Sequence, residues 1–243
     1  MNEYGTRVAA NLADVRRRID DACRAAGRDP AEVRLLPVSK TFGADAVRAA
    51  HAAGVRVVAE NKVQELQAKA AELADELPDL GWAAIGHLQT NKAKVVAQLA
   101  TEFHALDNRR VAAELDKRLA TAGRELDVFV QVNSSGEESK FGLEPDAVAA
   151  FADELAAFGR LRVRGLMTLA ANTADTARVA GCFDTMAGLR DRLRAGGAPG
   201  SWDELSMGMS GDFELAIAHG STCVRVGTAI FGVRPAPGGA GAR

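Results

Sequence analysis

Short apolar runs alternate with longer segments of helical periodicity along most of the chain. Runs rich in Val, Ile, Leu and Phe are typical of buried strands. The predicted strands cover residues 35–40, 55–60, 82–86, 103–106, 128–133, 163–168, 204–207 and 222–227. Apolar residues that recur every three or four positions predict helices between these runs. The predicted helices cover residues 8–26, 44–53, 63–77, 109–122, 145–158, 176–194 and 212–218.

Strands that alternate with helices pair in parallel through right-handed crossovers, so the pattern predicts an α/β protein. Eight such units, with the helix at 8–26 ahead of the first strand, fit a (β/α)8 TIM barrel with an extra N-terminal helix. A doubly wound open sheet is the alternative, and it requires a glycine-rich fingerprint after the first strand. The sequence KTFG at residues 40–43 follows that strand instead, which favours the barrel.

Composition limits the class of protein. The chain has 243 residues, of which 47% are hydrophobic, so it is long enough for one large core. We expect a single domain over residues 1–234 and a disordered Pro/Gly/Ala tail over 235–243. The net charge of -2 gives no general attraction to nucleic acids or acidic membranes. No apolar stretch is long enough to span a bilayer, and the charged N-terminus lacks the apolar core of a signal peptide.

Cysteine and histidine positions exclude two further kinds of site. The three cysteines are far apart and form no CxxC pair, which is typical of a protein kept in the reducing cytoplasm. The four histidines are also scattered, with no second ligand at metal-binding spacing. We therefore expect neither a disulfide framework nor a zinc site.

Lys40 ends the first predicted strand, and barrels bind ligands at the carboxyl ends of their strands. Burial disfavours an ammonium group, so it lowers the pKa of a lysine and makes the amine nucleophilic. Such a lysine forms a Schiff base with an aldehyde, including that of pyridoxal phosphate. The alternative is a strand-end lysine that reaches solvent. Lys62, in the loop after the second strand, is a rival Schiff-base lysine.

Two loops near the end of the chain predict an anion site. The sequence SMGMSGD at residues 206–212 contains two glycines and two serines and precedes a predicted helix. Backbone N–H groups and hydroxyls of such loops bind phosphate, and barrels commonly use the loops after strands seven and eight. Gly227 and Thr228 follow the eighth strand and supply the second half of the site. The alternative is a simple turn in which Ser210 caps the helix.

Arg225 lies inside the eighth strand, and alternation places it on the same face as Cys223 and Gly227. If Gly227 reaches the ligand, Arg225 points into the top of the barrel. A buried arginine stays charged and requires a partner. That partner is either an inward Asp or Glu or the ring nitrogen of pyridoxal phosphate. An arginine at the ring nitrogen keeps it unprotonated and weakens the cofactor as an electron sink.

For three features the residues alone leave two roles possible. Asn61 either hydrogen-bonds a ligand or caps the helix at 63–77. His87 either lies over the pocket or is structural. The polar loop at residues 134–142, which contains Lys140, is either a lid or a surface loop.

The motifs together make the chain similar to the pyridoxal phosphate homeostasis proteins. The matching stretches are PVSKT (37–41), ENKVQE (60–65), GHLQTNK (86–92), VN through KFG (132–142), RGLM (164–167), SMGMS (206–210) and VRVGT (224–228). They extend from the first predicted strand to the last, so the resemblance covers nearly the whole chain.

The resemblance implies a barrel like the N-terminal domain of alanine racemase, of fold type III among pyridoxal phosphate proteins, with the cofactor on Lys40. It implies phosphate contacts from Ser206, Ser210, Gly227 and Thr228. It also implies that Arg225 lies near the ring nitrogen and Asn61 beside the cofactor. Members of the family bind pyridoxal phosphate and balance its supply, without an established catalytic turnover.

Three functions compete. The first is a cytoplasmic homeostasis protein that holds pyridoxal phosphate as a Schiff base on Lys40 and passes it to pyridoxal phosphate-dependent apo-enzymes. The second is a racemase-like enzyme with weak activity, which needs a second acid/base on the other face of the cofactor. In alanine racemase a tyrosine is this second acid/base. The single tyrosine of this chain, Tyr4, precedes the first helical pattern, so His87 or Cys223 would have to take that role. The third is an interaction module without cofactor, which leaves Lys40 and Arg225 unexplained. Because the chain ends soon after the eighth strand, we expect a monomer.

Overall fold

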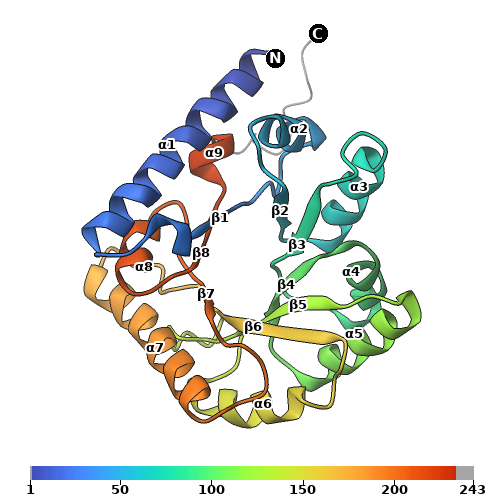
Figure 1. Ribbon diagram of the computed structural model, residues 1–243, viewed down its shortest axis with the longest axis vertical. Helices are drawn as coiled ribbons and strands as arrows, with labels where there is room; N and C mark the ends of the chain where they lie inside the picture. Colours follow the sequence, from blue (N-terminus) through green and yellow to red (C-terminus); the bar gives the residue numbers. More distant parts are fainter. Residues whose placement is uncertain (1, 234–243) are drawn as a thin grey trace.

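The computed structural model describes residues 2–233, which form a barrel of eight parallel strands (Figure 1). The strands follow the order β1-β8-β7-β6-β5-β4-β3-β2 around the sheet. They are β1 (Arg34–Pro37), β2 (Val57–Glu60), β3 (Gly81–Ala84), β4 (Glu102–Leu106), β5 (Leu126–Gln131), β6 (Leu161–Met167), β7 (Glu204–Ser206) and β8 (Cys223–Val226). The prediction of a (β/α)8 barrel with an extra N-terminal helix is confirmed.

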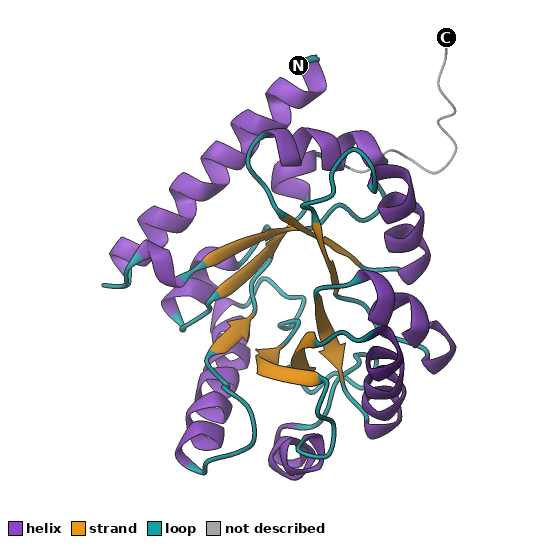
Figure 2. Cartoon of the chain, turned by 45° about the vertical axis from the view of Figure 1, so that its right-hand side comes forward, coloured by secondary structure: helices purple, strands orange, loops and turns teal. Residues whose placement is uncertain are grey.

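Helices surround the strands on the outside (Figure 2). The α-helices are α1 (Glu3–Ala25), α2 (Ala44–Ala52), α3 (Val63–Leu73), α4 (Ala93–Leu99), α5 (Arg109–Ala122), α6 (Val148–Leu155), α7 (Thr176–Ala195), α8 (Phe213–Ala218) and α9 (Thr228–Phe231). The 3-10 helices are η1 (Pro30–Glu32), η2 (Thr90–Lys92) and η3 (Pro145–Ala147).

α1 is the extra N-terminal helix, and it packs against α2, α8 and α9. The side chain of Asn2 caps it by accepting a hydrogen bond from the backbone N–H of Gly5 at 2.8 Å. Its buried stripe contains Val8, Leu12, Val15, Ile19 and Cys23. Because α9 has four residues, α1 completes the helical layer between α8 and α2.

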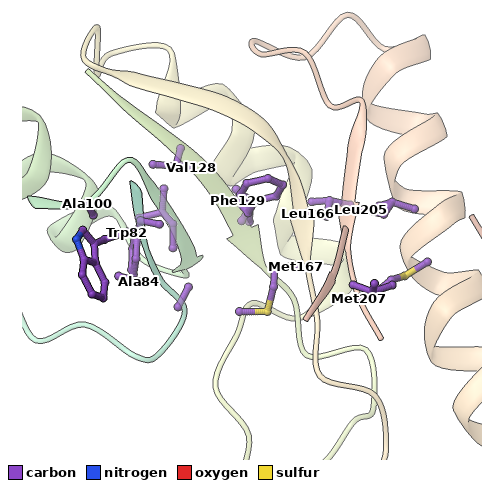
Figure 3. Packing of buried hydrophobic residues seen from close by; sticks show 14 of the residues in the cluster. Trp82, Ala84, Ala100, Val128, Phe129, Leu166, Met167, Leu205 and Met207 are labelled. Atoms are coloured by element: carbon purple, nitrogen blue, oxygen red, sulfur yellow. The ribbon is translucent and has the colours of Figure 1, made fainter. Parts of the chain in front are cut away.

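The largest buried apolar cluster includes side chains that pack between strands and helices, and Figure 3 shows part of it. Val128 on β5, Leu166 on β6 and Leu205 on β7 are fully buried there. A second, smaller cluster fills the inside of the barrel beside β1. Its buried members are Leu36, Val38, Ala59, Ala83 and Cys223.

The barrel closes weakly between β1 and β2. A single parallel bridge joins Val38 to Ala59, and the backbone N–H of Ser39 donates to the Ala59 carbonyl at 3.0 Å. Below this bridge a cavity of about 350 Å³ lies against β1, β2 and α1. This seam therefore depends on contacts other than a regular strand ladder.

Element boundaries differ from the predictions where a local feature ends the pattern. β1 ends at Pro37 rather than at Lys40, because its ladder with β8 ends where Pro37 pairs with Val226, the last residue of β8. The helix predicted over 145–158 starts as η3 and ends at Leu155. The short helices α4 and α9 are missing from the sequence prediction, since seven and four residues give little periodicity. The tail predicted over 235–243 lies outside the described residues.

Candidate functional site

A cavity of about 440 Å³ lies at the carboxyl ends of the strands, and its size is typical of a small-molecule site. Six of the seven predicted binding residues line it, namely Lys40, Asn61, Ser210, Arg225, Gly227 and Thr228. The lining has two cationic side chains, and none of its described members is a carboxylate. The cavity therefore suits an anionic ligand.

Lys40 is half-buried and takes the second position of a four-residue turn from Ser39 to Phe42. The backbone N–H of Phe42 donates to the Ser39 carbonyl at 3.1 Å. Thr41, in the third position, has a φ of 71°. A positive φ at this position is the mark of a type II turn, which normally uses Gly or Asn. A β-branched residue is strained there, so the surroundings must hold the turn.

Arg225 forms the deep end of the cavity and is 3% exposed. Its Nη1 donates to the carbonyl and the hydroxyl of Ser206 at 2.5 and 2.7 Å, and its Nη2 donates to the Thr168 carbonyl at 2.7 Å. These partners are neutral, and Arg225 forms no ion pair with an Asp or Glu among residues 2–233. The alternative of such an ion pair is therefore wrong. A guanidinium has five N–H groups, and these bonds leave at least two of them for a bound molecule. Burial lowers the pKa of Arg225.

Ser206, the seventh predicted residue, lies beneath Arg225 and not in the lining of the cavity, and it is fully buried. Its hydroxyl is 2.9 Å from Nδ1 of His104, whose Nε2 is 2.7 Å from Oε2 of Glu102. Arg34 donates to the same carboxylate oxygen at 2.8 Å. We call Arg34, Glu102, His104, Ser206 and Arg225 the core chain.

Burial fixes the direction of the hydrogen bonds in the core chain. It lowers the pKa of His104 to about 4, so the imidazole is neutral at pH 7. Burial opposes the charge of Glu102, but the hydrogen bond from His104 and the charge of Arg34 lower the pKa of Glu102 to about 2. A carboxylate only accepts, so Nε2 of His104 carries the proton and Nδ1 accepts from the Ser206 hydroxyl. The Ser206 oxygen then accepts from Arg225.

The loops after β7 and β8 meet at the cavity. The hydroxyl of Ser210 accepts a hydrogen bond from the backbone N–H of Ala229 at 3.4 Å, which joins the loop after β7 to α9. Asp212 is the N-cap residue of α8, so the alternative in which Ser210 caps this helix is wrong. Gly208 has a φ of 96°, and a Cβ added there would lie 2.7 Å from the Cβ of Ala216. Only glycine fits this close turn.

Asn61 reaches the cavity from the loop after β2. The N-cap residue of α3 is Lys62, so the alternative in which Asn61 caps that helix is wrong. Gly86 packs directly against the backbone of Asn61. A Cβ added at Gly86 would lie 2.0 Å from the Asn61 carbonyl oxygen, so a side chain does not fit there. Lys62 and His87 lie outside the lining, and His87 stacks on Phe141 with ring centroids 4.1 Å apart.

The apolar half of the lining is missing from the sequence prediction. It consists of Val38, Phe42, Ile85, Leu169 and Met209. Val38 and Ile85 continue the inward alternation of their strands, so the sequence did carry a signal for them. Leu169 and Met209 belong to loops, and only the folded chain brings them to the cavity.

Two further searches of residues 2–233 gave negative results. No helix in this range has the length and apolar character needed to cross a membrane. No three side chains of His, Cys, Asp or Glu in the same range are grouped closely enough to hold a metal ion.

The chain matches the family model described as the alanine racemase N-terminal domain over residues 10–235. It is 45% identical over 227 residues to the pyridoxal phosphate homeostasis protein of Pseudomonas aeruginosa, a match that covers 93% of this chain and 96% of that protein. The chain belongs to the pyridoxal phosphate homeostasis protein family. The Escherichia coli K12 member of this family is 40% identical over 232 residues, covering 93% of this chain and 97% of that protein.

Solved structures agree with this family assignment. PipY of Synechococcus elongatus PCC7942, solved with PLP bound, superposes with a TM-score of 0.80 at 36% identity and covers 93% of this chain and 100% of PipY. Alanine racemase of Clostridium difficile 630 has a TM-score of 0.70 at 15% identity, and the match covers 96% of this chain and 58% of the racemase. At that identity the racemase shows a shared fold alone. The pyridoxal phosphate homeostasis family therefore has the barrel of the alanine racemase N-terminal domain.

Proposed function

We propose that this protein binds pyridoxal 5′-phosphate (PLP) in the barrel cavity and regulates its supply in the cell. The observation that carries the proposal is the lining of the cavity. Lys40 and Arg225 face a space of about 440 Å³, and none of the described residues that line this space is a carboxylate. The named relatives and the PLP-bound PipY structure support the same ligand.

The lining residues match the parts of PLP. Backbone N–H groups and hydroxyls at Ser210, Gly227 and Thr228 suit a phosphate. A Cβ added at Gly227 would lie 3.0 Å from a backbone oxygen of Val38, so glycine keeps the backbone close and open at this edge. The remaining N–H groups of Arg225 suit a ring nitrogen without a proton. We assign Ser206 to holding Arg225, and not to the phosphate contact that the resemblance implies.

We infer that Lys40 is the covalent anchor and that Asn61 hydrogen-bonds the cofactor beside it. The Lys40 amine forms a C=N bond to the aldehyde carbon, and the aldehyde oxygen leaves as water with the two amine protons. This Schiff base is reversible, so the protein holds the reactive aldehyde without destroying it. When bound, PLP supplies an electron sink, and an arginine at its ring nitrogen weakens that sink. The arrangement therefore favours holding over turnover.

The racemase alternative requires a second acid/base at the cofactor. The described lining contains no tyrosine, histidine or cysteine. Tyr4 lies on α1, and His87 stacks on Phe141 outside the lining. Cys223 is fully buried, and this burial raises its pKa to about 11. These features support a protein that carries PLP without turning over a substrate.

We also propose that the protein is a cytoplasmic monomer that passes PLP to PLP-dependent apo-enzymes. Its exposed large apolar side chains, within the described residues, are Phe141, Leu169, Met209 and Val233. Leu169 and Met209 border the cavity, and so small an apolar rim suits a brief contact better than a permanent interface. Light scattering tests the monomer, and mixing loaded protein with an apo-enzyme tests the transfer.

The test of the proposed function is the visible absorbance of PLP-loaded protein before and after borohydride reduction, with peptide mass mapping. We expect a reducible band and a pyridoxyl mass on Lys40, and we expect Lys40→Ala to abolish both. Lys62→Ala is the matched control, because this neighbouring lysine lies outside the cavity lining and its loss should leave the band intact. A colourless protein that takes up no added PLP would overturn the proposal, and a pyridoxyl mass on Lys62 would move the anchor.

A further inference from the structure

The backbone on the N-terminal side of Lys40 is held by a buried ion pair. Lys69, on α3, donates from Nζ to the Ser39 carbonyl at 2.8 Å and to Oε1 of Glu60 at 2.6 Å. The Ser39 hydroxyl donates to the same Glu60 oxygen at 2.5 Å. The carbonyl and the hydroxyl of Ser39 are therefore fixed by side chains from β2 and α3.

A second carboxylate holds the backbone on the C-terminal side of Lys40. The backbone N–H of Thr41 donates to Oε2 of Glu65 at 2.8 Å. Nζ of Lys69 lies 3.9 Å from that oxygen, so one lysine interacts with both carboxylates. We call the following residues the clamp: Ser39, Thr41, Glu60, Glu65 and Lys69.

The clamp contains more buried charge than packing alone requires. The side chains of Lys69 and Glu60 are 8% and 0% exposed, and Oε2 of Glu60 has no hydrogen-bond partner among the described residues. Burial raises the pKa of Glu60. Apolar residues of similar volume often replace such a pair without loss of stability. The Lys69–Glu60 pair is therefore better explained by its hydrogen bonds to Ser39 than by a contribution to stability.

The group that it holds is the turn with Lys40 in its second position. This turn has a strained φ at Thr41 and lies at the seam where one bridge joins β1 to β2. Neither strand can hold the turn through a regular ladder here. The clamp ties both sides of it to β2 and α3, across the seam. Lys69 lies outside the cavity lining, so it acts on Lys40 through the backbone of Ser39.

We propose, on the basis of the function proposed above, that the clamp positions the Lys40 amine for covalent capture of PLP and that Lys69 is its central positioning residue. Phosphate binding belongs to the loops after β7 and β8, on other elements. Loss of the clamp therefore slows capture of the aldehyde and leaves recognition of the phosphate and ring unchanged.

The test compares Lys69→Met with the wild type in two measurements. Calorimetry gives the affinity for pyridoxine 5′-phosphate, which has the ring and phosphate of PLP without the aldehyde. Rapid quenching with borohydride, followed by mass spectrometry, gives the rate at which PLP becomes attached to the chain. We expect an unchanged affinity and a capture rate lower by about 10- to 100-fold, the effect of displacing a reacting group by ~1 Å.

Arg124→Met is the matched control. Arg124 also donates to backbone carbonyls, those of Ala97 and Ala100 at 2.7 and 2.8 Å, but it lies outside the clamp and the cavity lining. Its loss should change neither measurement. If the wild type captures no PLP, the proposed function fails. If the wild type captures PLP and folded Lys69→Met captures it equally fast, the role of the clamp alone is wrong.

Lys69→Met leaves Glu60 buried without its cation, so a second variant covers the case in which this protein does not fold. Glu65→Ala removes the acceptor for the Thr41 N–H, and its side chain is 27% exposed. We expect it to fold, to bind pyridoxine 5′-phosphate as the wild type does, and to capture PLP about 10-fold more slowly. Capture at the wild-type rate by this variant overturns the clamp.

Discussion

Two polar clusters support the cavity, and they hold its two cationic side chains, Lys40 and Arg225, in opposite ways. On the β1–β2 side, the clamp uses charged side chains to hold the backbone on either side of Lys40. On the β7–β8 side, the core chain holds the Arg225 side chain itself through carbonyl and hydroxyl groups. The carboxylate of the core chain, Glu102, lies behind His104 and Ser206.

The difference fits the role that we propose for each of the two side chains. A lysine that attacks an aldehyde must lose a proton and must point at the aldehyde carbon. The carboxylates of the clamp bind the Ser39 hydroxyl and the Thr41 N–H, so the clamp fixes the direction of Lys40 through the backbone on either side of it. An arginine at a ring nitrogen has to stay charged and keep one orientation. Neutral acceptors hold the planar guanidinium while leaving N–H groups for the ligand.

The largest effect that separates the two clusters is expected from Glu60→Ala. It leaves the buried Lys69 without its nearer carboxylate, so the free energy of unfolding should fall by about 3–5 kcal/mol. Urea denaturation measures this change. Glu65→Ala is the control, because this partly exposed pair should contribute about 1 kcal/mol or less. A loss below about 1 kcal/mol for Glu60→Ala would contradict the importance of the buried pair.

Acid should destabilise the core chain in two steps. The pKa of His104 is about 4 in the folded chain against 6.5 ordinarily, and the pKa of Glu102 is about 2 against 4.5. In both windows the unfolded chain binds more protons, so stability rises with pH. The melting temperature should therefore fall from pH 6.5 to 4 because of His104, and again from 4.5 to 2 because of Glu102.

Thermal melts between pH 7 and 3 check this profile, with His104→Gln as the comparison. The amide does not titrate, so the variant should lose the part of the pH dependence that begins near 6.5 and keep the part that belongs to Glu102. Identical slopes for the variant and the wild type between pH 6.5 and 4 would show that His104 is not the group responsible.

The sequence predicted the residues whose place depends on strand ends and alternation. Lys40, Arg225 and Gly227 lie in the cavity because the end of a strand and its inward face are both readable from the pattern. Ser206 was expected beside the phosphate, but it ends β7 and points beneath Arg225. How deep a strand residue lies in the barrel depends on the register between strands, and register cannot be predicted from the pattern of a single sequence.

The clamp is absent from the sequence prediction for a different reason. Lys69 falls on the buried face of α3, together with Val63, Leu66, Ala70 and Leu73. A lysine on an apolar face is therefore a readable signal that something unusual is buried. Its partners are Ser39 and Glu60, which only the docking of α3 across the seam brings together.

The smallest expected effect tests the core chain at its link to the cavity. Ser206→Ala removes one acceptor from Arg225 and one donor to His104, so it should cost about 1–3 kcal/mol of stability. Ser221→Ala is the matched control, because Ser221 is equally buried and its hydroxyl donates to the Met207 carbonyl at 2.7 Å. Both variants should lose similar stability in urea denaturation.

The two serines should differ in the visible spectrum of the PLP-loaded protein. Ser206→Ala loosens Arg225, the group that we propose for the ring nitrogen of PLP, so the band should shift or change its pH dependence. Ser221→Ala has no contact with Arg225 among the hydrogen bonds of the described residues, so its spectrum should match the wild type. An unchanged spectrum for Ser206→Ala would mean that the backbone carbonyls of Ser206 and Thr168 orient Arg225 without the hydroxyl. The core chain would then be a structural network of the barrel, and the clamp alone would position a residue of the site.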